Sequence, residues 1–315
     1  PRFGRMIYDQ AVELYDSARF EQALNKYNRA IWFDDSKAQY FQGKALVLDS
    51  LGKYKAAVEN YTQAIALDSV HAPTWYHRGM TFIAMDKREN AIQNFSRAIE
   101  LAPEMKEAHY QRGVALMNQK YYGKAIEDFS RVIDLDSSFA DAYFKRGACY
   151  REVGEKQKAV DDYSQALNLG MDNLNVYQQR AKALSDVKDY QQAISDYGRI
   201  IELTGGSKKL YYQRGYLHFL LNEYKQDPND PKVRFNLGLA RMHLGNFRNA
   251  RQNLQKATEL KEDYDKAYFL LGMTCANLKE HKNAIKHYSQ AITLDSTYQQ
   301  AYYYRGVSKG VQNNH

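Results

Sequence analysis

Small and aromatic side chains recur along the chain with a fixed spacing of 34 residues. Counted from Gly4, the repeats begin at residues 4, 38, 72, 106, 140 and 174 without an insertion, and then at 208, 231, 265 and 299. The fourth position of a repeat is usually aromatic, the eighth is Ala or Gly, and position 20 is Ala in every complete repeat. A fixed period in this range is typical of proteins in which each repeat packs mainly on its neighbours.

Each repeat is predicted to contain two α-helices. Apolar or small residues at positions 4, 8 and 11 share one face of a first helix, and those at positions 20, 24 and 27 share one face of a second. Small residues at positions 8 and 20 let the two helices approach closely. Each helix pair leaves an apolar edge that the next pair covers, so the pattern predicts an all-α fold.

These positions resemble the tetratricopeptide repeat, a helix-turn-helix unit of 34 residues, over residues 4 to 312 or so. The resemblance implies a right-handed α-solenoid, or superhelix, built as one continuous array. We expect six regular repeats over 4–207, an interrupted repeat over 208–230, two repeats over 231–298 and a partial terminal helix over 299–315.

The interrupted repeat has 23 residues and therefore lacks 11 that would carry its second helix. Its first helix is complete to Leu221, and "QDPNDP" follows as the turn toward the next repeat. Two explanations stay open: the sequence omits a stretch between Lys225 and Gln226, or an irregular loop bridges a true deletion. In both cases we expect residues 225–231 to be the least regular segment and a candidate hinge.

Arginine occupies position 7 in five consecutive repeats, where the family more often has Leu: Arg78, Arg112, Arg146, Arg180 and Arg214. Position 23, on the facing side of the second helix, is polar or acidic in four of these repeats, as Asn94, Asp128, Asp162 and Asp196. Two repeats with Leu at position 7 have no acid at position 23. Because a buried guanidinium needs a partner, this co-variation predicts a structural ladder of Arg–Asp pairs. A row that binds phosphate or carboxylate is the alternative.

In the family that the chain resembles, positions 2, 5, 6, 9, 12 and 13 line the concave surface. Position 5 is aromatic in most central repeats and position 6 is polar beside it. Aromatic rings supply contact area at low entropic cost, and amides can bond the main chain of a bound segment, so we predict a peptide-binding groove. The candidate groove residues are Tyr76, His77, Tyr110, Gln111, Phe144, Lys145, Gln179, Lys182, Tyr212, Gln213, Phe235 and Asn236. Alternatively, an aromatic at position 5 belongs to the groove floor whatever binds there.

The sequence does not match two specialised binding sites that are known in this family. The carboxylate clamp of heat-shock co-chaperones needs Lys at position 5, and no repeat has it. The asparagine ladder of the O-GlcNAc transferase solenoid at position 6 is matched only by Asn236, although three glutamines are chemically close. We expect a non-enzymatic scaffold that captures a protein or peptide segment. Two alternatives stay open. One is the binding arm of a larger enzyme such as a glycosyltransferase, which the missing initiator Met and the unfinished last repeat allow. The other is an architectural subunit of a cytoskeletal or ciliary assembly.

The composition fits a soluble, folded protein, with 44% hydrophobic and 26% charged residues and no apolar run of membrane-spanning length. Cys149 and Cys275 lie far apart without a CxxC motif, which argues against disulfides or zinc and favours a reducing, cytoplasmic compartment. No HExxH, GxSxG or P-loop motif is present, so we expect neither catalysis nor a cofactor.

Charge is distributed unevenly along the chain, whose net charge is +7. Residues 1–207 carry 27 basic and 28 acidic side chains, whereas residues 208–315 carry 17 and 9. This excess favours an acidic protein partner toward the C-terminal half. The scattered basic residues and the lack of any RNA-binding signature argue against nucleic acid.

Overall fold

The computed structural model describes residues 2–223 and 230–313, and this part of the chain contains 18 α-helices and no strand. The helices follow one another as tandem pairs, so the predicted all-α solenoid is confirmed. The chain divides into two compact units, Pro1–Met171 and Asp172–His315.

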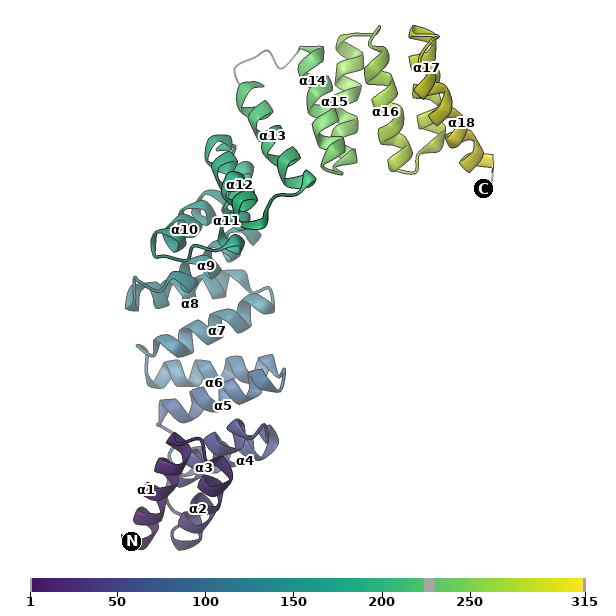
Figure 1. Cartoon of the computed structure of the whole chain (residues 1–315). Helices are drawn as coiled ribbons and strands as arrows, with labels where there is room; N and C mark the ends of the chain where they lie inside the picture. Colours follow the sequence, from purple (N-terminus) through teal and green to yellow (C-terminus); the bar gives the residue numbers. More distant parts are fainter. Residues whose placement is uncertain (1, 224–229, 314–315) are drawn as a thin grey trace. The chain divides into compact units, whose positions relative to one another are not determined.

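The first unit contains five helix pairs, which stack in chain order (Figure 1). The pairs are α1 (Arg2–Asp16) with α2 (Phe20–Phe33), α3 (Ala38–Ser50) with α4 (Tyr54–Leu67), α5 (Ala72–Ala84) with α6 (Arg88–Leu101), α7 (Lys106–Asn118) with α8 (Tyr122–Leu135), and α9 (Ala140–Glu152) with α10 (Lys156–Asn168).

The second unit contains three helix pairs and two single helices. The pairs are α11 (Leu174–Asp186) with α12 (Tyr190–Thr204), α14 (Pro231–His243) with α15 (Phe247–Leu260), and α16 (Asp265–Asn277) with α17 (His281–Leu294), while the single helices are α13 (Lys208–Glu223) and α18 (Gln299–Asn313). Helix α13 is the first helix of the interrupted repeat. The junction of Lys225 and Gln226 lies outside the described residues, so the two explanations of the interruption are not distinguished.

The two helices of a pair are in tight contact where position 8 meets position 24. A Cβ atom built on Gly79 would lie 2.6 Å from Cε1 of Phe95, and one on Gly272 would lie 2.6 Å from Cδ1 of Tyr288. The ring at position 24 therefore fills the space that a larger residue at position 8 would need. This contact explains why glycine or alanine recurs there.

The turn inside each pair has a left-handed residue at the same place, position 15 of the repeat. Only three of these residues are glycine; the set comprises Ala18, Gly52, Asp86, Lys120, Gly154, Lys188, Gly245 and Lys279. Left-handed backbone costs a non-glycine residue about 1–2 kcal/mol, so the packing of the flanking helices imposes this turn on them.

Candidate partner-binding surface

Four of the five predicted ladder arginines, all except Arg214 on the single helix α13, bind side chains of the second helix of their own pair. In the first unit, Arg146 on α9 donates from Nε and Nη2 to the two carboxylate oxygens of Asp162 on α10, at 2.8 Å in both cases. Arg112 binds Asp128 in the same way, at 2.9 and 2.7 Å. These planar, bidentate contacts are the geometry that a guanidinium and a carboxylate prefer.

Two further arginines follow this arrangement with small differences. Arg180 in the second unit donates to both oxygens of Asp196, at 2.9 and 2.6 Å. Arg78 donates from Nε to Oδ1 of Asn94 at 2.8 Å, because the amide offers only one acceptor atom.

The same arginines also reach the preceding helix pair, which the sequence analysis did not anticipate. Nη1 of Arg146 donates to Oγ of Ser130 on α8, and Nη1 of Arg112 donates to Oγ of Ser96 on α6, both at 3.0 Å. Nη1 of Arg78 donates to Oγ1 of Thr62 on α4, also at 3.0 Å. A hydroxyl 16 residues before each arginine was the available signal. Because their donors are used inside the fold, the structural interpretation of this row is favoured over anion binding.

Aromatic residues at position 4 cover the guanidinium groups. The guanidinium carbon of Arg78 lies 4.7 Å from the ring centre of Trp75, and that of Arg146 lies 5.5 Å from the ring centre of Tyr143. In the fourth repeat His109 takes this place and its Nδ1 lies 3.1 Å from Oδ1 of Asp128. The recurring aromatic–x–x–Arg–Gly segment thus combines a stacking ring, a bridging cation and a small residue for helix contact.

The rings at position 5 in the first unit are partly buried on the rings at position 24 of their own pairs. The ring centres of Tyr76 and Phe95 are 5.8 Å apart, and those of Phe144 and Tyr163 are 5.6 Å apart. Tyr110 packs on Phe129 in the same manner, at 6.0 Å. These rings therefore form part of the hydrophobic core as well as the surface above it.

Two candidate groove residues of the first unit are brought together with an acid. The hydroxyl of Tyr110 donates to Oδ2 of Asp141, and Nζ of Lys145 lies 3.6 Å from the same oxygen. Burial and this hydrogen bond raise the pKa of Tyr110. Gln111 is partly exposed beside them, and its amide makes no hydrogen bond to any residue in the described part of the chain.

His77 is enclosed by other rings instead. Its ring centre lies 5.3 Å from that of Tyr76 and 6.5 Å from that of Tyr61. Burial lowers the pKa of His77, and the nearby His71 lowers it further, so the imidazole is neutral at pH 7.

The candidate residues of the second unit are more varied in their surroundings. Gln179 donates to Oδ1 of Asn175 at 3.3 Å, Lys182 and Asn236 are exposed, and Gln213 is partly exposed. Phe235 stacks on Tyr264 with ring centres 4.9 Å apart. The side chain of Tyr212 lies outside the described residues.

One carboxylate at position 12 was missed by sequence reasoning. Oδ2 of Asp49 on α3 accepts hydrogen bonds of 2.8 Å from the hydroxyls of Tyr61 on α4 and Thr81 on α5. Burial raises the pKa of Asp49. The carboxylate thus joins three helices, and no cation in residues 2–223 and 230–313 forms an ion pair with it.

The described residues offer few side chains suited to metal binding or nucleophilic chemistry. No cluster of His, Cys, Asp and Glu in residues 2–223 and 230–313 is suited to a metal ion. Burial raises the pKa of Cys149 to about 12 and that of Cys275 to about 11, so both thiols are protonated and weakly nucleophilic at pH 7. None of the described helices combines the length and apolarity that crossing a bilayer requires.

Comparison with protein-family models identifies tetratricopeptide repeats along more than half of the chain. The matched residues are 38–71, 76–138, 140–173, 174–205, 231–264 and 265–298. No curated protein matches the chain.

Many solved structures match the fold. The C-terminal part of a repeat protein from Cytophaga hutchinsonii is 16% identical and has a TM-score of 0.56, over 84% of this chain and 99% of that one. Pseudomonas aeruginosa pilF is 21% identical with a TM-score of 0.54, over 65% and 93%. The MamA protein is 23% identical with a TM-score of 0.50, over 53% and 91%. At these identities the likeness concerns the fold alone.

Proposed function

Because the chain belongs to the tetratricopeptide repeat family, whose fold is typical of protein–protein interaction scaffolds, we propose that it captures a segment of a partner protein on the first helices of its pairs. Repeats of this family are generally non-enzymatic, and we propose no catalytic role for the chain itself.

The observation that carries this proposal is a row of partly exposed apolar side chains at position 9 in the first unit. The row consists of Val12, Leu46, Met80 and Val114, on α1, α3, α5 and α7. The free amide of Gln111 lies one turn before Val114 on the same face of α7. Apolar contacts flanked by unused hydrogen-bonding groups suit a polypeptide, which brings both side chains and main-chain amides.

The exposed lysines of the second unit suit a partner segment that is acidic. Three of the unit's five first helices carry lysine at position 2, as Lys209, Lys232 and Lys266, and each lysine is exposed without an ion pair to any described carboxylate. Position 2 is acidic in two repeats of the first unit, as Glu107 and Asp141. We propose that an acidic stretch of the partner binds near these lysines.

A peptide-display selection on the full chain tests the proposal. Selected peptides are expected to bind about tenfold more weakly to a variant with Gln111→Ala and Val114→Lys, because a charge enters the apolar row. Circular dichroism checks that the variant is folded. Gln93→Lys, on the exposed side of α6, adds the same single charge as the control and is expected to leave affinity unchanged. Equal affinity of both variants and the wild type would exclude this face as the binding site.

A further inference from the structure

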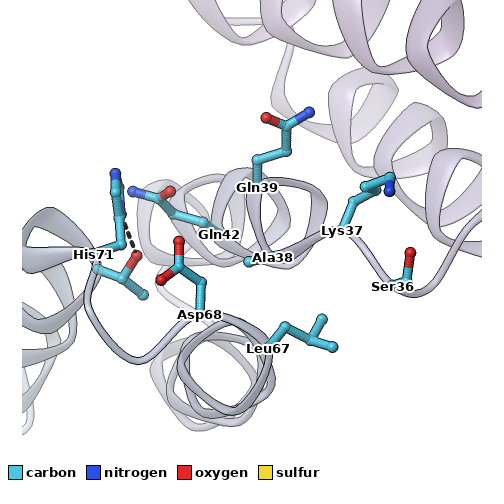
Figure 2. A pocket seen from close by; sticks show the side chains of 9 residues that line it. Ser36, Lys37, Ala38, Gln39, Gln42, Leu67, Asp68 and His71 are labelled. Atoms are coloured by element: carbon cyan, nitrogen blue, oxygen red, sulfur yellow. Dashed lines mark hydrogen bonds between the residues drawn. The ribbon is translucent and has the colours of Figure 1, made fainter.

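A polar pocket of about 420 Å³ lies in the first unit, between the start of α3, the turn after α4 and the start of α5. Its walls include Gln39, Gln42, Asp68 and His71, and Figure 2 shows Gln42, Asp68 and His71 gathered at one end. Nδ1 of His71 lies 2.8 Å from Oγ1 of Thr74, and this contact holds the imidazole in place.

The equivalent place two repeats later is filled by the protein itself. There Nζ of Lys106, at position 1, lies 2.7 Å from Oδ2 of Asp136, at position 31. The same ammonium lies 5.3 Å from the ring centre of Phe139, at position 34, and that ring packs edge-on against Tyr110, at position 5, with centres 5.1 Å apart. A lysine and two aromatic rings thus occupy the space, and an acid binds the lysine.

The repeat that forms the pocket keeps the acid and lacks all three fillers. Positions 1, 5 and 34 are Ala38, Gln42 and His71, whereas position 31 is still an aspartate, Asp68. Oδ1 of Asp68 accepts the main-chain N–H of Val70 at 3.2 Å, and no cation of the described residues lies within ion-pair distance of its carboxylate. The pocket therefore retains the anion and lacks the cation that accompanies it in the later repeat.

We infer that this pocket binds a lysine side chain of the partner polypeptide, an inference that rests on the proposed function. In this arrangement the ammonium of the bound lysine pairs with Asp68, as that of Lys106 pairs with Asp136. Its aliphatic stem lies between Gln42 and His71, and His71 takes the place that Phe139 has beside Lys106. The pocket adjoins positions 2 and 5 of α3, where the side chains of Gln39 and Gln42 can bond the main chain beside the lysine.

One cation of this protein lines the pocket and does not satisfy Asp68. Nζ of Lys37 lies 3.6 Å from Oδ2 of Asp34, the acid of the preceding turn. In Figure 2, Lys37 and Ser36 lie at the opposite end of the pocket from His71. The end formed by Asp68 therefore has no ammonium group of this protein against its carboxylate in the described residues.

The test uses the full chain and the peptides selected on it. Lysine is expected to be enriched among them, and replacing the critical lysine by norleucine is expected to weaken binding about tenfold. Asp68→Asn is expected to weaken the lysine peptide by a similar factor and to leave the norleucine peptide unchanged. Asp295→Asn, at the same position of a later repeat, is the matched control and should change neither affinity.

A second variant fills the pocket with the residues of the later repeat: Ala38→Lys, Gln42→Tyr and His71→Phe. It is expected to stay folded and to lose the preference for lysine over norleucine. Suppose that the variant with Gln111→Ala and Val114→Lys binds the selected peptides more weakly, but that neither the lysine-to-norleucine change nor Asp68→Asn alters their affinity. This inference is then wrong and the proposed function stands. If no peptide is selected, both are wrong. If N-acetyl-lysine methylamide alone binds as tightly as the peptides, the ligand is a small amine, which also overturns the inference.

Discussion

Arg146 links three helices of the first unit through a single side chain. It donates to Asp162 on α10 and to Ser130 on α8 from its own place on α9. The hydrogen bond to Asp162 raises the pKa of Arg146 above its already high ordinary value, so the guanidinium is charged throughout the pH range in which proteins fold. The cation therefore stabilises both the contact inside one helix pair and the contact to the preceding pair.

Removing one member of this pair is expected to cost more than removing both. Arg146→Leu leaves the buried carboxylate of Asp162 unpaired and is expected to lower the free energy of unfolding by about 1–3 kcal/mol. Adding Asp162→Leu should recover much of that loss, because no buried charge remains. Urea unfolding of the two single variants and the double variant measures the interaction free energy of the two side chains. If the losses in the single variants simply add in the double variant, the two side chains do not interact.

Gly79 is expected to be intolerant of even one added methyl group. Its Cβ would lie 2.6 Å from Phe95, a fully buried ring, so Gly79→Ala is expected to destabilise the protein by about 1–2 kcal/mol despite the better helix propensity of Ala. Gly198→Ala is the matched control, because nothing lies within 4 Å of a Cβ at that helical position. It should stabilise the protein by roughly 0.5–1 kcal/mol in the same thermal unfolding assay.

At the scale of helices, sequence reasoning succeeded where a pattern repeats and failed where it does not. The helix pairs follow from the 34-residue period, and the Arg146–Asp162 contact follows from internal co-variation. Ser130 was missed because position 25 lies on the preceding helix pair, so its spacing of 16 residues from the arginine acquires meaning only once the pairs are stacked. The pocket was missed because its wall combines one departure from the aromatic pattern at position 5, Gln42, with Ala38 and His71 at positions 1 and 34, which follow no strict pattern and which only the fold brings together.

Asp49 gives the packing of α3, α4 and α5 a dependence on pH. Burial raises the pKa of Asp49 in the folded protein, so the folded state binds a proton more tightly than the unfolded chain. The contribution of this group to stability is therefore greatest below the unfolded pKa of about 3.9 and is lost as the pH rises through the folded pKa. Ionised Asp49 thus costs stability at pH 7.

Asp49→Asn is expected to remove that cost while keeping the hydrogen bonds. The amide oxygen can accept from Tyr61, and the amide nitrogen can donate to Oγ1 of Thr81, which itself donates to the backbone oxygen of His77 at 3.0 Å. Hydrogen exchange in α3, α4 and α5 should therefore be slower in the variant than in the wild type at pH 7, and this advantage should shrink toward pH 3.5. A variant that exchanges faster at pH 7 would contradict the prediction.

At the scale of the whole molecule, the two compact units differ in the charge that their first helices present. In the first unit, Asp141 at position 2 is bound by Tyr110 and Lys145, whereas Glu107 at the same position of α7 is exposed. In the second unit the lysines at position 2 are exposed and without a carboxylate partner among the described residues. One partner chain with a lysine at one site and an acidic stretch at another would satisfy both proposals.

The lysines at position 2 of the second unit are expected to bind acidic peptides because they lie together on the first helices, and not only because they add to the net charge of the unit. Changing all three to Gln (Lys209, Lys232 and Lys266) should weaken binding of a labelled octaglutamate peptide by about fivefold to tenfold at 50 mM salt. The difference should shrink as salt rises to 300 mM, because exposed charges are screened. The control changes three other exposed lysines of the same unit to Gln, with the same net charge: Lys261, Lys279 and Lys282. Fluorescence anisotropy measures both variants, and equal losses would mean that the peptide senses only the overall charge of the unit.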